Sequence, residues 1–216
     1  MSEESKVREQ ICMMARSIYE RGLTGGASGN ISVRLSDSRL LVTPTGSCFG
    51  RLDPARLALF DPDGVHVAGD RPTKEMPLHS AFYETRGAKT GAVVHLHSCH
   101  SVALSVLPDT DPDNMLPPLT AYGVMKLGQV KLLPYFMPGD PAMGDAIRGL
   151  AGKRSAVVLA HHGPVVAGKD LEAAVYATEE LEETAKLALL TRGLGPRLLD
   201  QSQINGLITK FDVEWE

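Results

Sequence analysis

Two features are missing from this sequence: a long apolar run and paired cysteines. No stretch of about 18 apolar residues occurs, so no part of it has the composition of a membrane-spanning helix. The first 22 residues are charged and follow a helical pattern, without the apolar core of a signal peptide. The three cysteines, Cys12, Cys48 and Cys99, lie far apart and form no CxxC motif, which indicates reduced thiols. We therefore expect a cytoplasmic protein with no membrane segment.

The sequence also lacks a cluster of basic residues. It has 22 Lys and Arg residues against 26 Asp and Glu residues, and its formal net charge is −4 at pH 7. This balance argues against a nucleic-acid partner. Hydrophobic residues make up 43% of the chain and charged residues 22%, which is typical of globular proteins. No linker or repeat divides the 216 residues, so we expect a single domain over residues 1–216.

Apolar periodicity predicts helices alternating irregularly with short strands. Helices are expected over residues 4–21, over residues 75–86, in "SCHSVALSVL", and from after Asp170 to near Gly193. A shorter helix in "GDPAMGDAIRGLAG" is expected to have Asp140 as its N-cap. The expected strands lie in "GNISVR", "RLLVT", "GVHVAGD", "GAVVHLHS", "SAVVLAH" and "PVVAG". This order predicts an α/β domain with helices on both faces of a mixed central β-sheet.

Histidines gather at the end of one predicted strand. The stretch "GAVVHLHSCH" contains three of the seven histidines within six positions. Residues two apart on a strand point to the same face, so His95 and His97 are expected to lie side by side while Leu96 turns into the core. Cys99 lies just beyond them, and we interpret it as a packed thiol.

A second histidine cluster, "LAHHG", follows another apolar run. If that run forms a strand neighbouring "AVVHLH", then His161 or His162 can join the first two histidines. Three imidazoles suit zinc or a similar transition ion. The alternative is a hydrogen-bonded histidine at each strand end, without a metal.

An acidic residue opens the predicted helix in "RPTKEMPLHSAF". Beside a buried metal, Glu75 could be a fourth ligand or an acid and base, and one carboxylate can do both in turn. The alternative is a glutamate that only favours the helix dipole. His79, four residues further on, is interpreted as structural.

Two polar glycine turns, "ASGNIS" and "TPTG", form a further candidate site. Glycines let backbone N–H groups approach a ligand closely, and such groups can form a nest for a phosphate. Neither turn is a Walker or dinucleotide-binding motif, so two ordinary turns remain the alternative. The candidate phosphate-binding residues are Ser28, Gly29, Asn30, Thr45, Gly46, Thr73 and Lys74.

Five segments, "GGASGNISVR", "LLVTPTG", "TKE", "AVVHLH" and "HHG", together resemble the class II aldolase/adducin family in their order and spacing. The resemblance extends from Glu4 to about Arg192. It implies a three-layer fold of the class II aldolase type and one Zn²⁺ per subunit, with Mn²⁺ or Co²⁺ as alternatives. It also implies a homotetramer with active sites near the subunit interfaces.

The resemblance also implies particular residue roles. The zinc-binding histidines of the family correspond to His95, His97 and His162, and its catalytic carboxylate corresponds to Glu75. Its phosphate contacts correspond to Gly29, Asn30, Thr45, Gly46, Thr73 and Lys74.

Within the family, residues 116–140 resemble the 3-oxo-tetronate 4-phosphate decarboxylases. The pair Thr73–Lys74 stands where the sugar-phosphate aldolases generally have two serines, and a lysine suits a phosphorylated sugar acid. We therefore expect a carbon–carbon lyase of four-carbon sugar-acid catabolism. It would release CO₂ and dihydroxyacetone phosphate through a metal-stabilised enediolate. The alternative is an aldolase of the fuculose-phosphate type, which gives dihydroxyacetone phosphate and an aldehyde.

Several assignments are left with alternatives. Tyr122, in "LTAYGVM", is either a second proton donor or a packed aromatic residue. The C-terminal tail has Phe211 and Trp215 but lacks the tyrosine that the fuculose-phosphate aldolases contribute across a subunit interface. An epimerase, a dehydratase and a non-catalytic scaffold of the adducin type are further alternatives, and the scaffold is disfavoured because all the expected metal ligands are present.

Overall fold

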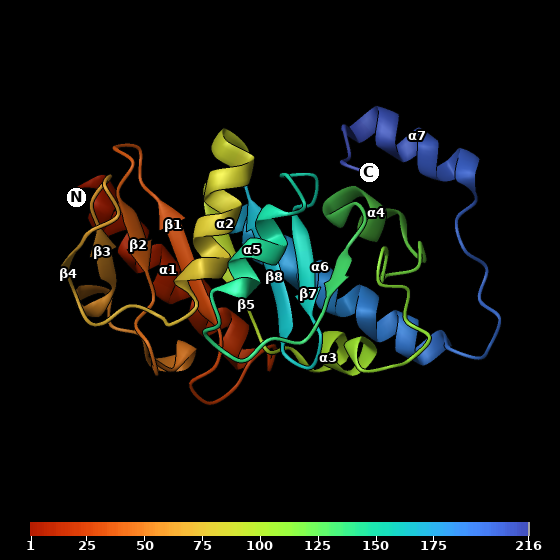
Figure 1. The fold of residues 1–216 in the computed structure, drawn as a ribbon, viewed down its shortest axis with the longest axis horizontal. Helices are drawn as coiled ribbons and strands as arrows, with labels where there is room; N and C mark the ends of the chain where they lie inside the picture. The colour runs from red at the N-terminus through yellow and green to blue at the C-terminus, as the bar shows by residue number, and fades with distance from the viewer. Residues whose placement is uncertain (216) are drawn as a thin grey trace.

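One mixed β-sheet forms the centre of the protein, which is described by a computed structural model over residues 1–215. Within that range the sheet has eight strands in the order β4-β3-β2-β1-β5-β8-β7-β6 (Figure 1). The strands are β1 (Asn30–Arg34), β2 (Leu40–Val42), β3 (Ala58–Phe60), β4 (His66–Ala68), β5 (Ala92–His95), β6 (Lys131–Leu133), β7 (Ala156–Leu159) and β8 (Gly163–Gly168). The pair β6–β7 is parallel, whereas β5 runs antiparallel to both of its neighbours, β1 and β8. The single-domain prediction extends to Glu216, which lies outside the described residues.

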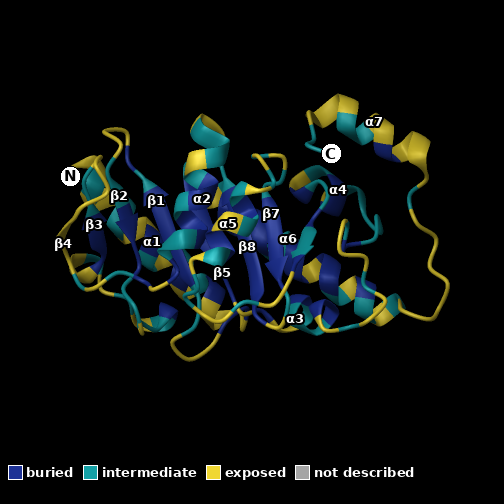
Figure 2. Ribbon diagram, viewed as in Figure 1, coloured by how far each residue is buried: buried dark blue, intermediate teal, exposed yellow. Residues whose placement is uncertain are grey.

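Helices cover both faces of this sheet, as the sequence predicted. The helices are α1 (Glu3–Glu20), α2 (Met76–Arg86), α3 (Cys99–Ser105), α4 (Ala121–Leu127), α5 (Ala142–Arg148), α6 (Leu171–Thr191) and α7 (Gln201–Phe211). Helices α1, α3 and α6 pack on one face, and α2 and α5 pack on the other. Strand β5 has apolar residues on both faces: Val94 joins the core under α1 and α6, and Val93 joins the core under α2 and α5. Figure 2 shows the central strands buried between the two helical layers.

Local capping residues account for several helix boundaries. Helix α6 begins after Asp170, whose side chain accepts a hydrogen bond from the backbone N–H of Ala173, as expected of an N-cap. Helix α5 begins at Ala142, one residue later than predicted, and its N-cap is Pro141 instead of Asp140. Asp140 still accepts a hydrogen bond from the N–H of Ala142 at 2.9 Å.

The interpretation of Cys99 as a packed thiol is wrong, because this residue is exposed. The sequence patterns did not predict helices α4 and α7, which pack against each other beyond one edge of the sheet (Figure 1). Over residues 1–215, none of the helices is long and apolar enough to cross a membrane.

Candidate active site

The histidine-bearing segments meet where the central strands β5 and β8 end and begin, because these two strands pair antiparallel. His95 is the last residue of β5 and pairs with Val165 of β8. His162 immediately precedes β8, so antiparallel pairing places it beside the end of β5. The strand before His162 is β7, and it is not the neighbour of β5, since β8 lies between them. The convergence that was conditional on such a neighbour therefore comes about through β8.

The glycine between His162 and the rest of β8 permits a close approach of the two segments. Gly163 has φ +151°, and a Cβ added to it would lie 2.1 Å from the carbonyl oxygen of Leu96. Leu96 itself is buried in the core, as expected for the residue between two histidines that face the other way. The motif "HHG" therefore needs its glycine for packing against the "HLH" segment.

Four side chains converge at this point: Glu75, His95, His97 and His162. Their nearest ligand atoms all lie within 4.8 Å of one another. The Nε2 atom of His97 is 3.2 Å from Nε2 of His95 and 3.1 Å from Nε2 of His162. The two carboxylate oxygens of Glu75 lie 3.3 Å from Nε2 of His95 and 3.1 Å from Nε2 of His162.

This donor set fits a transition-metal ion. The Nδ1–H of His95 donates a hydrogen bond to the carbonyl oxygen of Pro164 at 2.8 Å, so its Nε2 carries a lone pair that points into the cluster. Three convergent imidazole nitrogens and one carboxylate are the ligand types that Zn²⁺ binds in a tetrahedral site. A cation between these groups would satisfy lone pairs that otherwise face one another.

The protonation states expected here also suit a metal. Burial lowers the pKa of His95 to about 3, and burial likewise lowers the pKa of His97. Burial alone would raise the pKa of Glu75, but the hydrogen bond with His162, the electrostatic interaction with His95 and the hydrogen bond from Asn30 together hold it below its usual range. Neutral His95 and His97 beside an ionised carboxylate are the forms that bind a metal.

Glu75 occupies the N-cap position of α2 rather than its first turn. Its side chain makes no capping hydrogen bond and instead faces the histidines. Asn30, the first residue of β1, donates a hydrogen bond from Nδ2 to Glu75 Oε2 at 2.7 Å. The backbone N–H of Glu75 donates to Thr73 Oγ1 at 3.2 Å. The location of the carboxylate therefore matches the ligand and acid/base hypotheses better than the helix-dipole alternative.

The seven candidate phosphate-binding residues line one cavity of about 200 Å³, together with Glu75 and His97. Two pairings bring their loops together: Pro44 bridges to Pro72, and Asn30 pairs with His95. Gly29 and Gly46 have φ angles of +86° and +68°, the left-handed region that favours glycine. The carboxamide of Asn30 already contacts Glu75 and His79, which leaves one N–H for a ligand.

The cavity includes two residues from a loop that was not predicted to belong to the site. Pro138 and Gly139 lie in the loop between β6 and α5 and line the cavity close to Lys74. Their Pro-Gly sequence indicates a turn, but no local pattern shows that this turn packs against a loop that precedes α2. Tyr122 is 63% exposed on α4 and does not line this cavity in the described part of the chain.

Comparisons with known proteins agree with this geometry. The family model described as Class II Aldolase and Adducin N-terminal domain matches residues 9–189. The chain is 45% identical over 219 residues to a 3-oxo-tetronate 4-phosphate decarboxylase from Cupriavidus necator, and the alignment covers 100% of both chains. It is 30% identical over 213 residues to the L-fuculose phosphate aldolase of Escherichia coli K12, covering 97% of this chain and 95% of the aldolase.

A solved structure shows the same fold. The crystal structure of YgbL from Escherichia coli superposes with a TM-score of 0.92 at 43% identity, covering 95% of this chain and 99% of YgbL. The family and the fold class that the sequence predicted are thereby confirmed. The chain belongs to the class II aldolase and adducin family.

Proposed function

We propose that this protein catalyses the metal-dependent decarboxylation of a 3-oxo-tetronate 4-phosphate to dihydroxyacetone phosphate and CO₂. The observation that carries the proposal is the single cavity in which the candidate phosphate-binding residues adjoin Glu75 and His97. The full-length similarity to the decarboxylase of Cupriavidus necator supports the same reaction. The enzyme is accordingly a carbon–carbon lyase of the carboxy-lyase type.

The residues of the cavity divide into a binding group and a reacting group. Backbone N–H groups at Gly29 and Gly46, with the hydroxyls of Thr45 and Thr73, hold the phosphate. The hydroxyl of Ser28 donates to the carbonyl oxygen of Gly25 at 2.6 Å and must turn away from it to join them. The exposed Lys74 adds a positive charge at the edge of the same cavity, which suits a substrate that carries both a phosphate and a carboxylate. Anchoring the phosphate orients the bond that breaks with respect to the neighbouring carbonyl group.

A Zn²⁺ ion held by His95, His97, His162 and Glu75 would supply Lewis-acid stabilisation of the charge that develops on the carbonyl oxygen. Mn²⁺ and Co²⁺ can bind to the same ligand types and are the alternative metals. Cleavage between the carboxylate carbon and the carbon bearing the hydroxyl releases CO₂ and leaves the enediolate of dihydroxyacetone phosphate. Glu75 is ionised and borders the cavity, so it first accepts a proton from the substrate hydroxyl or from water and then passes it to this carbon. One proton taken up from solvent balances the loss of CO₂.

The reaction can be tested by a coupled assay for dihydroxyacetone phosphate, with the 3-oxo acid generated in place and its spontaneous decay subtracted. We expect zinc-loaded enzyme to accelerate release of the triose phosphate, and chelation to return the rate to the blank. Equal amounts of CO₂ and triose phosphate identify a decarboxylase. Activity only in the condensation of dihydroxyacetone phosphate with an aldehyde would instead identify the aldolase alternative.

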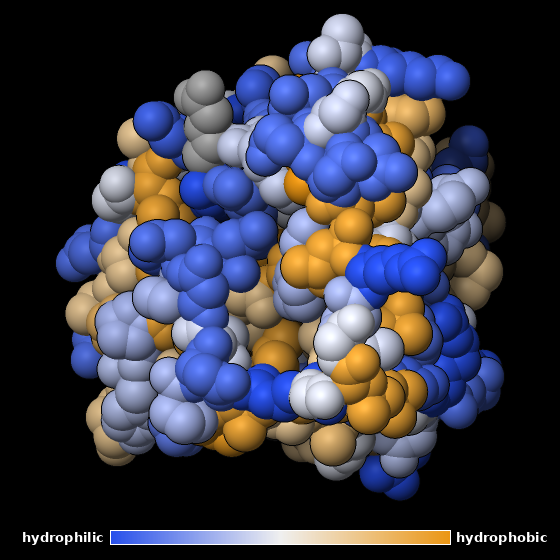
Figure 3. Space-filling model, turned by 90° about the vertical axis from the view of Figure 1, so that its right-hand side faces the viewer, coloured by the Kyte–Doolittle hydropathy of each residue, from blue (hydrophilic) through white to orange (hydrophobic). Residues whose placement is uncertain are grey.

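We further propose that residues 1–216 act as one domain of a cytoplasmic homotetramer. Large apolar side chains are exposed at the end of the molecule that carries α7, including Leu190 at 65% and Leu194 at 77%. Figure 3 shows apolar side chains gathered on this face, and such patches commonly mark subunit interfaces. Tyr122, which is exposed on α4, is the proposed second proton donor. The three free cysteines suit a reducing compartment.

The assembly is tested by light scattering coupled to gel filtration. We expect a mass of roughly four times the 23.2 kDa of one chain, as for a closed symmetric oligomer. Replacing Leu194 by aspartate should lower that mass if the apolar face forms an interface. A monomer for the unmodified protein would contradict the proposal.

A further inference from the structure

A buried chain of hydrogen bonds runs from Glu75 along the interface between α2 and β1. Asn30 Nδ2 lies 2.7 Å from Glu75 Oε2, and Asn30 Oδ1 lies 2.5 Å from His79 Nε2. On its other side, His79 Nδ1 lies 2.7 Å from Ser32 Oγ, which is 2.9 Å from the hydroxyl of Tyr83. His79 and Ser32 are completely buried, and Asn30 is 4% exposed.

The regular periods of helix α2 and strand β1 account for this series of hydrogen bonds. Glu75, His79 and Tyr83 are four residues apart, so they lie on one face of α2 and its N-cap. Asn30 and Ser32 are two residues apart and lie on the face of β1 that is turned toward α2. Side chains four residues apart on a helix are separated by about 6 Å along its axis, and side chains two residues apart on a strand by about 6.6 Å. These similar spacings let the side chains of α2 and β1 alternate along their interface.

Only one direction of hydrogen bonding satisfies every member of the chain. Ionised Glu75 can only accept, so the Asn30 amide must direct its NH₂ group toward it and its oxygen toward His79. His79 must then carry its proton on Nε2 and accept at Nδ1 from the hydroxyl of Ser32. Ser32 in turn accepts from the hydroxyl of Tyr83. A reversed Asn30 would place its carbonyl oxygen against the carboxylate, which is repulsive.

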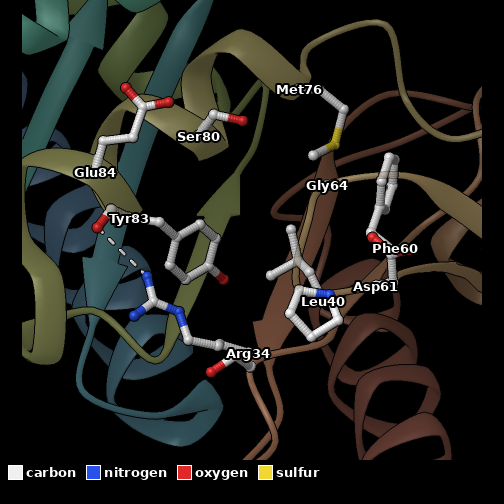
Figure 4. A pocket seen from close by; sticks show the side chains of 11 residues that line it. Arg34, Leu40, Phe60, Asp61, Gly64, Met76, Ser80, Tyr83 and Glu84 are labelled. Atoms are coloured by element: carbon white, nitrogen blue, oxygen red, sulfur yellow. Dashed lines mark hydrogen bonds between the residues drawn. The ribbon is translucent and has the colours of Figure 1, made fainter.

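The outer end of the chain is held by Arg34. Its guanidinium lies over the Tyr83 ring, 4.5 Å from the centroid, and its Nη2 donates to the Tyr83 carbonyl oxygen. Figure 4 shows this pair at the edge of a second cavity, of about 500 Å³, between α2 and the outer strands of the sheet. Tyr83 is therefore fixed on the side that faces away from Glu75.

We infer that His79 is a positioning residue for the reaction: through its Nε2–H it fixes the Asn30 amide in the orientation that presents an N–H group to Glu75. The inference rests on the proposed role of Glu75 as metal ligand and proton-handling group. It replaces the interpretation of His79 as merely structural. His79 does not line the cavity, and its two ring nitrogens bond to Asn30 and Ser32, so its hydrogen-bonded route to Glu75 runs through Asn30.

The test compares two substitutions at the same position. In His79→Gln the side-chain nitrogen can reach the place of Nε2 and still donate to Asn30, whereas the shorter side chain of His79→Asn reaches only the place of Nδ1. We expect kcat to fall by about ten- to a hundredfold in His79→Asn and only a few-fold in His79→Gln, with little change of KM in either. The affinity for Zn²⁺ alone, measured by competition with a chromogenic chelator, should follow the same order.

Thermal unfolding of both variants separates positioning from stability. The inference would be overturned if His79→Asn and His79→Gln lost the same amount of kcat and of zinc affinity. It would also be overturned if these losses simply followed the decrease of Tm in each variant. The zinc titration needs no substrate, so it tests His79 even if the unmodified enzyme proves inactive on the sugar acid and the proposed function fails. If the variants do not fold, imidazole ¹⁵N NMR of the unmodified protein decides: a proton on Nε2 of His79 supports the inference, and a proton on Nδ1 contradicts it.

Discussion

Replacing Glu75 by glutamine is expected to lower kcat by about 10²- to 10⁴-fold, the range in which a positioned acid or base contributes. Glutamine keeps the length and the oxygen that accepts from Asn30, but it loses the negative charge and cannot take up a proton at neutral pH. Three histidines remain to hold the metal, so zinc content should fall much less than turnover. The measurement pairs steady-state kinetics with zinc analysis of the same preparation.

A matched control for this substitution lies on the same helix. Glu84→Gln also neutralises a glutamate on α2, but Glu84 forms an exposed ion pair with Arg148. An exposed pair contributes little to stability, so kcat in this control should change by about twofold or less. Turnover in Glu75→Gln equal to that of the control would eliminate Glu75 as the acid and base.

The second large effect is expected for His97→Ala. This change removes the imidazole whose Nε2 lies within 3.2 Å of both other ligand nitrogens. His97 is also the most exposed of the four ligands, so its removal should disturb the fold less than removal of the buried His95. We expect the zinc content to drop well below stoichiometric and kcat/KM to fall about a thousandfold, because a Lewis acid contributes several kcal/mol to such a step.

His161→Asn is the appropriate comparison for this prediction. His161 adjoins His162 in the sequence but does not belong to the four-residue cluster, and it is exposed with φ +60°. Asparagine tolerates this backbone conformation, so the substitution removes an imidazole without adding strain. The control should keep its zinc and its activity. Full zinc occupancy in His97→Ala would show that the metal is held by other groups.

Much of this site could be predicted from local patterns. The spacing of His95 and His97 follows from the two-residue period of a strand, and the buried Leu96 between them follows from the same period. The location of Glu75 at the start of α2 was predicted to within one residue, because a helix boundary is a local property. These features depend on neighbouring residues in the chain. The family resemblance adds which of the separate motifs contribute to the same site.

Features that depend on contacts between distant segments could not be predicted in this way. The loop containing Pro138 and Gly139 reaches the cavity because α5 packs beside α2, and nothing near residue 138 specifies that contact. The hydrogen bonding of His79 depends on how α2 crosses β1, so its sequence neighbourhood indicated only a helical histidine.

The residue types and their order along the chain account for the chemistry of this protein: the imidazoles and the carboxylate, the glycine turns, and the succession of motifs that identifies the family. The packing of the fold places β8, and not β7, beside β5, and turns Asn30 toward Glu75. Side-chain chemistry and backbone periodicity are properties of short segments, whereas strand order and the direction of a buried hydrogen-bond chain arise only when segments far apart in the chain pack together.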